Sequence, residues 1–286
     1  MQFLCKKQTK NLFLVGVDEY YSFASNKFIS FVKHYFFLHI SPNFNSMNWL
    51  KKLAVFIFFL KVAICSNAQT NAIKANKDGL VVINKKRDYF TSIQQGPEKK
   101  MVAVDNYLIH AKYDWKYATI NNFTHQVLYK HPAAYTRTQA AKALQLIEID
   151  LNEQGLGLII YDAYRPYSVT KKMWEAVPDD RYAANPAKGS NHNRGAAVDV
   201  SLYNLQTGDP LLMPTPFDDF SEKAHHNYMQ LPQEILQNRS ILKNVMTKYG
   251  FIALDTEWWH YYLPNAVSSF EILDFNFRQM RSLNQE

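Results

Sequence analysis

The chain has 286 residues, of which 47% are hydrophobic, and it carries a formal net charge of +7. This composition indicates a globular protein with enough apolar material for a core, and the length allows one or two domains. Residues 1–68 contain eight basic and two acidic residues, whereas residues 69–286 contain 24 and 23. The excess positive charge therefore lies almost entirely in residues 1–68, the leader. The nearly neutral remainder of the chain argues against a nucleic-acid partner.

The leader has the pattern of an export signal behind an uncertain upstream extension. Residues 1–46 are aromatic-rich and without clear periodicity, and we interpret them as sequence translated from too early a start codon. Residues 47–68 begin with a second methionine and two lysines, continue with the apolar run 53–60, and end in small residues. This pattern predicts a signal peptide and an exported, periplasmic protein. Since the run is too short to span a bilayer comfortably, we expect no stable membrane span after cleavage. An uncleaved N-terminal anchor is the alternative.

Both cysteines of the chain, Cys5 and Cys65, lie in this leader. A mature chain that begins at Gln69 would contain none. Disulfides, thiolate nucleophiles and cysteine-based zinc sites are therefore excluded for it.

The remainder of the chain predicts one α+β domain. Residues 69–100 are polar and lysine-rich, and they indicate a loosely structured lead-in with one short strand at 80–83. Apolar residues at helical spacing predict a helix over roughly 138–154, and further helices are expected over about 167–177, after Pro166, and over about 233–249, which Gly250 would cap. Short apolar and aromatic runs predict strands at 156–161, 198–202, 211–213 and 251–263. A single domain over 101–286, with a small antiparallel sheet and helices packed on one side, fits this order best.

A histidine and an aspartate lie close together in the chain around a turn of small residues. His192 precedes Asp199 by seven residues, and the aspartate sits in an apolar, strand-like run. An imidazole and a carboxylate brought together in this way suit zinc, which usually takes three protein ligands at a catalytic site. The acidic and imidazole groups within 255–260 offer the third ligand.

Glu257 and His260 stand three residues apart in an aromatic run that favours a strand. In a regular strand their side chains would face opposite ways. Both can reach one metal ion only if the strand bends, bulges or ends there. We expect His260 to be the third zinc ligand and Glu257 to be the general base toward the water that zinc activates. The alternative is a surface carboxylate beside a packed histidine.

Arg165 follows a predicted strand and directly precedes a proline, which places it on a rigid loop. A guanidinium there can stabilise the oxyanion of a tetrahedral intermediate or bind a substrate carboxylate. A structural salt bridge with Asp162 is the alternative. The adjacent pair His225 and His226 offers further potential ligands, but adjacent histidines rarely serve one metal, and we interpret them as structural or solvent-facing.

Three motifs in this order resemble a known family. They are Asp162-Ala-Tyr-Arg165-Pro, Ser190-x-His192-x-x-Gly195-x-Ala197-x-Asp199 and Glu257-Trp-Trp-His260. Together they resemble the D-alanyl-D-alanine dipeptidases of the vancomycin-resistance type, which are zinc peptidases related to D,D-carboxypeptidases and to the hedgehog signalling domain. The resemblance covers about residues 102 to 277 and implies a hedgehog/D,D-peptidase-like fold.

The resemblance also implies the role of each site residue. His192, Asp199 and His260 would bind one zinc ion per chain, Glu257 would act as general base and then general acid, and Arg165 would stabilise the transition state. Three further positions match residues that line the substrate pocket in the family: Tyr117, Ser190 and Asp218. Asp218 would meet the free ammonium of the substrate, which selects a free dipeptide over a longer peptide.

The expected function is thus hydrolysis of the small-molecule dipeptide D-Ala-D-Ala. One alternative is a D,D-carboxypeptidase or peptidoglycan endopeptidase that cleaves larger muropeptides, which export favours and Asp218 disfavours. A second alternative is a zinc-stabilised binding or signalling domain without turnover, against which the presence of Glu257 counts. The oligomeric state does not follow from the sequence.

Overall fold

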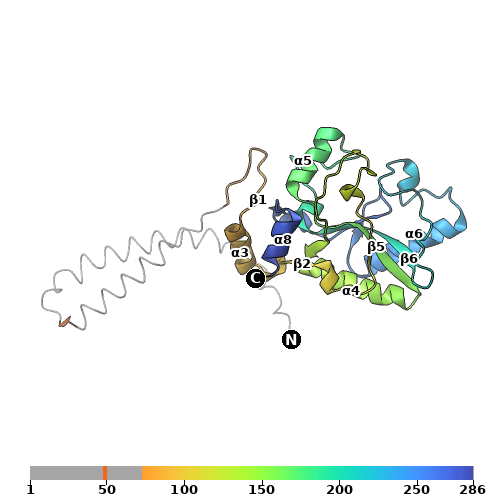
Figure 1. Cartoon of the computed structure of the whole chain (residues 1–286), viewed down its shortest axis with the longest axis horizontal. Helices are drawn as coiled ribbons and strands as arrows, with labels where there is room; N and C mark the ends of the chain where they lie inside the picture. The colour runs from red at the N-terminus through yellow and green to blue at the C-terminus, as the bar shows by residue number, and fades with distance from the viewer. Residues whose placement is uncertain (1–47, 50–72, 286) are drawn as a thin grey trace, which may run out of the picture. The chain divides into compact units, whose positions relative to one another are not determined.

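The computed structural model describes residues 48–49 and 73–285 (Figure 1). The predicted upstream extension and almost all of the predicted signal peptide lie outside the described residues, so both stay predictions. Across residues 48–49 and 73–285, no helix is long and apolar enough to cross a bilayer. Residues from Ile73 onward form one compact unit.

A five-stranded sheet lies at the centre of this unit. In spatial order its strands are β3 (Lys112–Tyr113), β5 (Leu156–Asp162), β6 (Ala197–Asn204), β8 (His260–Tyr262) and β7 (Ile252–Ala253). The edge strand β3 runs parallel to β5, and all other pairs are antiparallel. Because side chains alternate along a strand, β6 turns Val198, Val200 and Leu202 to the larger hydrophobic core and Asp199 to the opposite face.

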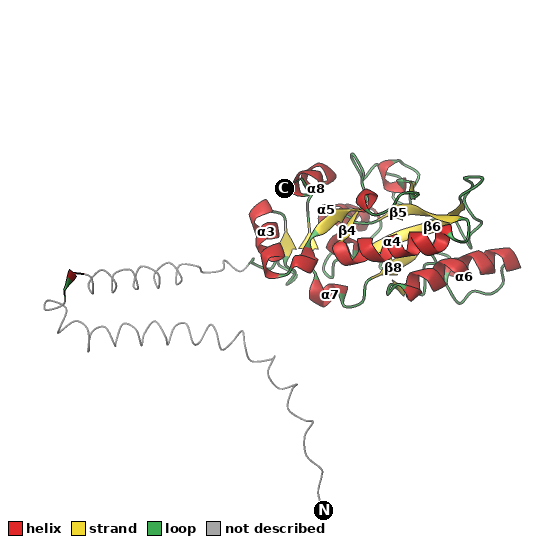
Figure 2. Cartoon of the chain, turned by 90° about the horizontal axis from the view of Figure 1, so that it is seen from below, coloured by secondary structure: helices red, strands yellow, loops and turns green. Residues whose placement is uncertain are grey.

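Two helices cover the core face of the sheet. They are α4 (Thr138–Asn152) and α6 (Gln233–Lys248), which lie side by side on the same side of the sheet (Figure 2). Each buries an apolar stripe with helical spacing, and Leu144 and Ile147 of α4 join Leu242 and Met246 of α6 in the core. Both helices were predicted, α4 from this spacing and α6 from its position before Gly250, and the predicted α+β class with a small sheet and covering helices is confirmed.

A second hydrophobic cluster joins the two ends of the described chain. Its elements are β1 (Val82–Ile83), α3 (Lys86–Gln95), β2 (Met101–Ala103), β4 (Tyr135–Arg137), α5 (Tyr167–Ala176), β9 (Ile272–Leu273) and α8 (Phe277–Leu283). Strand β2 pairs antiparallel with β4. The short helix α7 (Ala266–Ser269) precedes β9. Helix α5 was predicted after Pro166 and lies on the other side of the sheet from α4 (Figure 1).

The prediction of a loosely structured lead-in is wrong for residues 73–100. Strand β1, which was expected, pairs in parallel with β9, and a ten-residue helix, α3, follows it. Tyr89 of α3 is buried, and its hydroxyl accepts a hydrogen bond from the Met101 amide at 2.8 Å. Lys99 forms an ion pair with Glu271 at 2.6 Å. The segment is ordered by partners near the other end of the chain, which its polar composition does not reveal.

Two predicted strands differ from the structure. Residues 211–213 form no strand, although the Leu211 amide donates to the Leu202 carbonyl at 2.9 Å and an isolated bridge joins Tyr203 to Pro210. The predicted long strand 251–263 is a hairpin of β7 and β8, which are paired with each other and joined by a turn. Strands β5 and β6 lie where they were predicted.

Gly195 adopts a left-handed conformation with φ of 66° between His192 and β6, and a Cβ there would overlap the side chain of Met101. Gly155 is a matched control, because it has φ of 72° and open space around the position of a Cβ. We expect Gly155→Ala to lower the free energy of unfolding by about 1 kcal/mol through backbone strain alone, and Gly195→Ala to lower it by about 3 kcal/mol because overlap adds to strain. Urea unfolding measures both, and equal losses would contradict the assigned close contact.

Candidate metal centre and active site

The register of three strands brings acidic and imidazole side chains into one row. Asp199 of β6 is paired with His260 of β8 on one side and with Asp162 of β5 on the other. Directly paired residues on neighbouring strands point to the same face of a sheet. The register of β5 against β6 shifts between Ile160 and Asp162. This bulge places Asp162 opposite Asp199, whereas regular pairing would place it opposite Val198 and turn it toward the core.

His192 approaches the row from a short 3₁₀ turn, His192–Arg194, that ends at Gly195. Its Nδ1 lies 2.6 Å from the carbonyl oxygen of Ala163. Since a carbonyl oxygen can only accept a hydrogen bond, this contact assigns the ring proton to Nδ1. The lone pair of Nε2 is then available to bind a metal ion. An imidazole oriented through its second nitrogen in this way is typical of metal-binding histidines.

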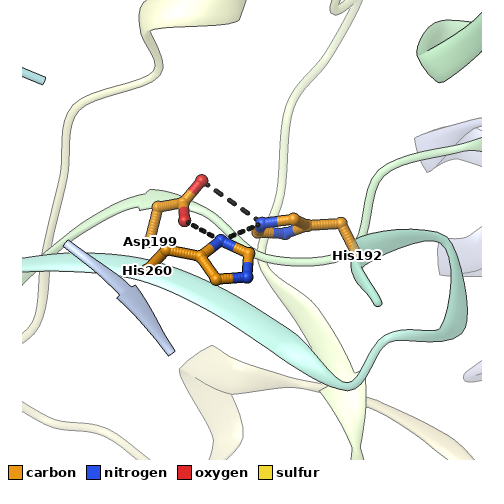
Figure 3. A group of neighbouring side chains, drawn as sticks. All are labelled: His192, Asp199 and His260. Carbon is orange, nitrogen blue, oxygen red and sulfur yellow. Dashed lines mark hydrogen bonds and ion pairs between the residues drawn. The ribbon is translucent and has the colours of Figure 1, made fainter. Parts of the chain in front are cut away.

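Three ligand atoms converge at the centre of the site (Figure 3). His260 Nδ1 lies 2.9 Å from Asp199 Oδ1 and 3.2 Å from His192 Nε2, and His192 Nε2 lies 3.3 Å from Asp199 Oδ2. All of these atoms fall within 4.8 Å of one another, so the group can hold a metal ion. Burial raises the pKa of Asp199, but His192 and His260 outweigh it and hold that pKa below its ordinary value. The carboxylate is therefore available as an anionic ligand.

Glu257 reaches the same site because the chain turns between β7 and β8. The Glu257 amide donates to the Leu254 carbonyl at 3.1 Å, and the His260 amide donates to the Glu257 carbonyl at 3.3 Å. Buried Trp258 anchors the turn, with its indole nitrogen donating to Thr215 Oγ1 at 3.0 Å. Glu257 Oε2 lies 3.9 Å from His260 Nδ1. The required bend is present, and burial raises the pKa of Glu257, which suits a group that must accept and return a proton.

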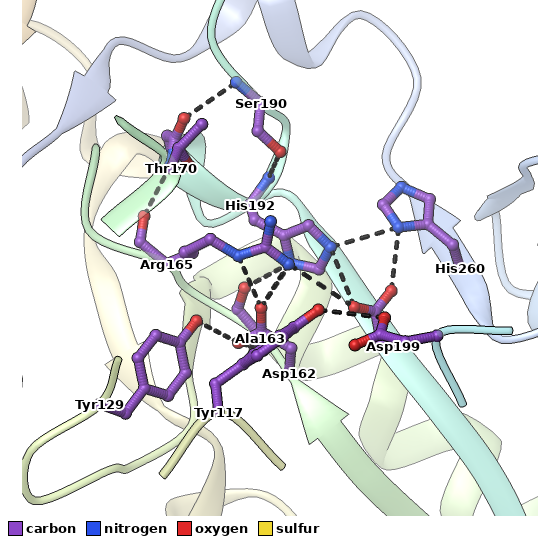
Figure 4. Close-up of polar contacts among 12 residues, drawn as sticks. Tyr117, Tyr129, Asp162, Ala163, Arg165, Thr170, Ser190, His192, Asp199 and His260 are labelled. Carbon is purple, nitrogen blue, oxygen red and sulfur yellow. Dashed lines mark hydrogen bonds and ion pairs between the residues drawn. The ribbon is translucent and has the colours of Figure 1, made fainter. Parts of the chain in front are cut away.

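Arg165 both forms a salt bridge and faces the site. Its Nε and Nη2 lie 2.9 and 2.8 Å from Asp162 Oδ2, and its Nη2 lies 3.9 Å from Asp199 Oδ2 (Figure 4). The other oxygen of Asp162 accepts from the Tyr129 hydroxyl at 2.8 Å and from the Ala163 amide at 2.9 Å. The sequence left a structural salt bridge as the alternative to a functional role for Arg165. In the structure the salt bridge with Asp162 is present, and it holds the guanidinium in the lining of the cavity.

One cavity of about 370 Å³ contains every predicted site residue. Its lining includes the three ligand residues, the general-base candidate, the arginine and the three pocket residues: His192, Asp199, His260, Glu257, Arg165, Tyr117, Ser190 and Asp218. Ser190 Oγ accepts from the His192 amide at 3.2 Å, which ties the pocket wall to a ligand. The structure thus brings together all the residues that the motifs predicted for one site.

Asp218 adds a buried carboxyl group to the lining of this cavity. Its Oδ1 accepts from the Tyr117 hydroxyl at 3.1 Å, and its backbone has φ of 63°. Its Oδ2 is buried without a hydrogen-bond partner among the described residues. Burial, followed by the charge of Asp199, raises the pKa of Asp218 well above its ordinary value. A cation beside Asp218 would provide this buried oxygen with a partner and stabilise the ionised carboxylate.

Comparison with known proteins agrees with this geometry. The family model described as D-ala-D-ala dipeptidase matches residues 97–278. The chain belongs to this family. A D-alanyl-D-alanine dipeptidase of Escherichia coli is 37% identical over 54% of this chain and 79% of its own length. The dipeptidase of Enterococcus faecalis is 32% identical over 58% of this chain and 92% of its own length, and that of Enterococcus faecium is 30% identical over 58% and 95%. The resemblance drawn from the three motifs is confirmed.

The dipeptidase-family site contains supporting groups that the motifs did not identify as functional. The sequence indicates Asp162 only as a salt-bridge partner of Arg165. It contains no signal for the contact of the Ala163 carbonyl with His192 or of Tyr129 with Asp162. The periodicity of β5 gave no sign of the bulge that aims Asp162. His226, by contrast, is buried away from this cavity, and burial together with Lys243 lowers its pKa to about 4. This agrees with a structural role for that histidine.

The ligand group predicts which variants lose a bound metal. We expect the purified protein to carry one divalent metal ion per chain, His192→Ala to lose it, and Glu257→Gln to retain it, because Glu257 is not in the ligand group. Elemental analysis after dialysis against metal-free buffer measures all three. His226→Ala is the control for removal of a buried imidazole elsewhere. Loss of the metal from Glu257→Gln but not from His192→Ala would refute the assigned ligand set.

Proposed function

We propose that this protein is a zinc-dependent dipeptidase that hydrolyses free D-Ala-D-Ala. Membership of the dipeptidase family supports a peptidase, and the names of the curated relatives support the substrate. The single observation that carries the proposal is the cavity itself. It places a metal-ligand group, a carboxylate suited to proton transfer, a guanidinium and an unpartnered carboxylate around a space of about 370 Å³. That volume lies near the lower end for small-molecule sites.

Zinc is the metal that fits the donor set best. Two imidazole nitrogens and one carboxylate are a common ligand set of catalytic zinc, and the described residues contain no thiolate. The Ala163 carbonyl orients one of the imidazoles, as second-shell groups do in zinc enzymes. When bound, zinc polarises a substrate carbonyl and lowers the pKa of a water toward about 7.

Glu257 carries the proton. Its carboxylate lies beside the ligand group without belonging to it, at 3.9 Å from His260 Nδ1. In the ionised form it takes a proton from the attacking water, and in the protonated form it donates this proton to the leaving amine. A single carboxylate can do both because the two transfers follow one another on the same side of the peptide bond.

Arg165 supplies positive charge where the oxyanion develops. Asp162 holds the guanidinium through two contacts, and Tyr117 lies under it with its ring centroid 5.2 Å from the guanidinium carbon. Since these partners fix the group before substrate binds, little reorganisation is needed during the reaction. A preorganised charge of this kind is typically worth about 3 kcal/mol in the transition state.

Asp218 selects the free amine of the substrate. A dipeptide ammonium placed at Oδ2 would provide the partner that this buried oxygen lacks among the described residues. An acylated amine can donate at most one N–H and carries no charge, so it leaves the carboxylate without an opposite charge. This supports a free dipeptide as substrate rather than the interior of a longer peptide.

The proposal is tested by hydrolysis of D-Ala-D-Ala with residues 69–286. We expect metal-loaded protein to release D-alanine, a chelator to abolish the activity, and added zinc to restore it. Glu257→Gln should lower kcat by about 100-fold or more while zinc stays bound, because general-base catalysis contributes 10²–10⁴-fold. Measured D-alanine release provides kcat and KM. Near-normal turnover by Glu257→Gln would refute its role, and absence of hydrolysis by zinc-loaded protein would refute the proposed function.

The role of Asp218 is tested against its neighbour. We expect Asp218→Asn to raise KM for D-Ala-D-Ala by about 30-fold or more, because loss of one partner of a buried charge pair costs roughly 2–5 kcal/mol. Asp219→Asn is the matched control: it removes the same charge one residue away, outside the lining of the active-site cavity. Steady-state kinetics of both variants decide the matter. Equal effects would show that overall negative charge, and not Asp218, attracts the substrate.

A further inference from the structure

A second cavity lies directly beside the active site. It has a volume of about 500 Å³ and shares three lining residues with the active-site cavity: Tyr182, Asp218 and Phe220. The rest of its lining combines apolar and polar side chains: Phe123, Val177, Asp219 and Ser221. These three side chains form the wall between the two cavities, and the proposed ammonium site at Asp218 is part of that wall.

The aromatic part of the wall is a pair of rings in contact. Tyr182 and Phe220 pack edge to face, with ring centroids 5.0 Å apart and an interplanar angle of 79°. Phe220 is supported on two further sides, by Trp259 at 6.1 Å and by Phe123 at 5.7 Å. Trp259 belongs to the turn that carries Glu257. Phe220 is therefore packed against the same turn that positions the general-base candidate.

Tyr182 reaches the wall from a different kind of element. It lies in the segment between α5 and the 3₁₀ turn at His192, which contains no helix or strand, and 38% of its surface is exposed. Its neighbours in the chain, Asp180, Arg181 and Ala183, also line the active-site cavity. One half of the wall is thus supported by buried aromatic packing, and the other half is supplied by a surface segment.

The position of the wall determines what the substrate amine can carry. In the proposed function, on which this inference rests, the amine lies at Asp218. A group attached to that amine must extend past Asp218, where the Tyr182–Phe220 pair closes the way into the second cavity. Such a substrate leaves the buried Oδ2 of Asp218 without an ammonium partner, and its added group meets the rings of Tyr182 and Phe220 at the shared wall.

We propose that the Tyr182–Phe220 pair determines the length of the substrate, by closing the active site against peptides extended at the amino end. The rejected class is D-Ala-D-Ala whose amine is acylated, whether by an acetyl group or by a further amino acid. Removal of the pair joins the two cavities. The opened space can hold an added residue, and it presents Asp219 and Ser221 to the amine or amide of that residue.

Three variants test the proposal: Tyr182→Ala, Phe220→Ala and the double variant. Each is assayed in the zinc-loaded protein with free D-Ala-D-Ala, N-acetyl-D-Ala-D-Ala and Gly-D-Ala-D-Ala, and the readout is the ratio of kcat/KM for each extended substrate to kcat/KM for the free dipeptide. We expect this ratio to rise by at least about tenfold in the double variant, since one missing or added group at a packed site changes discrimination by 10–200-fold. Val177→Ala is the control, because it widens the second cavity without opening the wall.

The outcomes separate this proposal from the proposed function. An unchanged ratio in variants that still hydrolyse the free dipeptide overturns the role of the wall and leaves the dipeptidase function standing. Failure of the unsubstituted protein to hydrolyse D-Ala-D-Ala overturns the function first. If the double variant does not fold, Tyr182→Ala alone decides, because this half-exposed side chain lies outside both hydrophobic clusters. A rise in Val177→Ala equal to that in the wall variants also counts against the proposal.

Discussion

The site depends on the register of strands β5, β6 and β8. Asp162, Asp199 and His260 face one another because each is paired across the sheet with the next. A slip of one residue in β8 would replace His260 by Tyr261, which packs in the core, and would turn the imidazole to the wrong face. The burial of Tyr261 opposes such a slip, since the slip would take its ring out of the core and place His260 there instead. The hydrophobic core therefore maintains the metal-ligand geometry without contacting the metal site.

The active-site cavity is lined by more acidic side chains than arginines. Four carboxylates, those of Asp180, Asp199, Asp218 and Glu257, line the cavity, and a fifth, Asp162, forms a salt bridge with the lining residue Arg165. Burial raises the pKa of both Asp218 and Glu257, because the charged form of a carboxyl is disfavoured away from water. A bound dication beside Asp199 and Glu257 and a substrate ammonium at Asp218 would each place positive charge next to these carboxylates. The electrostatics thus favour a metal ion and a free amine in the same site.

The sequence predicted which residues form the site better than it predicted the strands, bulge and turn that position them. His192, Asp199, Glu257, His260 and Arg165 were identified because their residue types and spacing suit one metal-assisted reaction. Helix α4 followed from apolar periodicity, helices α5 and α6 from a flanking proline and a capping glycine, and the central strands from short apolar runs, all of which are local signals. What could not be predicted depended on distant partners. Strand β1 and helix α3 are ordered by β9, the bulge in β5 appears only against β6, and the aromatic run 251–263 divides because Trp258 and Trp259 are buried in a turn.

The two forms of substrate selection differ in the elements that carry them. The metal ligands, the base and the arginine are held by paired strands and by turns anchored in the core, so their geometry changes little without loss of the fold. Tyr182, by contrast, belongs to a surface segment with no regular structure, and Phe220 lies outside the sheet. Of the two rings, Tyr182 is therefore the one that can change with the least effect on the fold, whereas Phe220 packs on Trp259 of the turn that presents Glu257. Charge recognition at Asp218 and steric closure at Tyr182 and Phe220 act on the same substrate amine, but of these three residues only Tyr182 stands apart from the packing that supports the reaction centre.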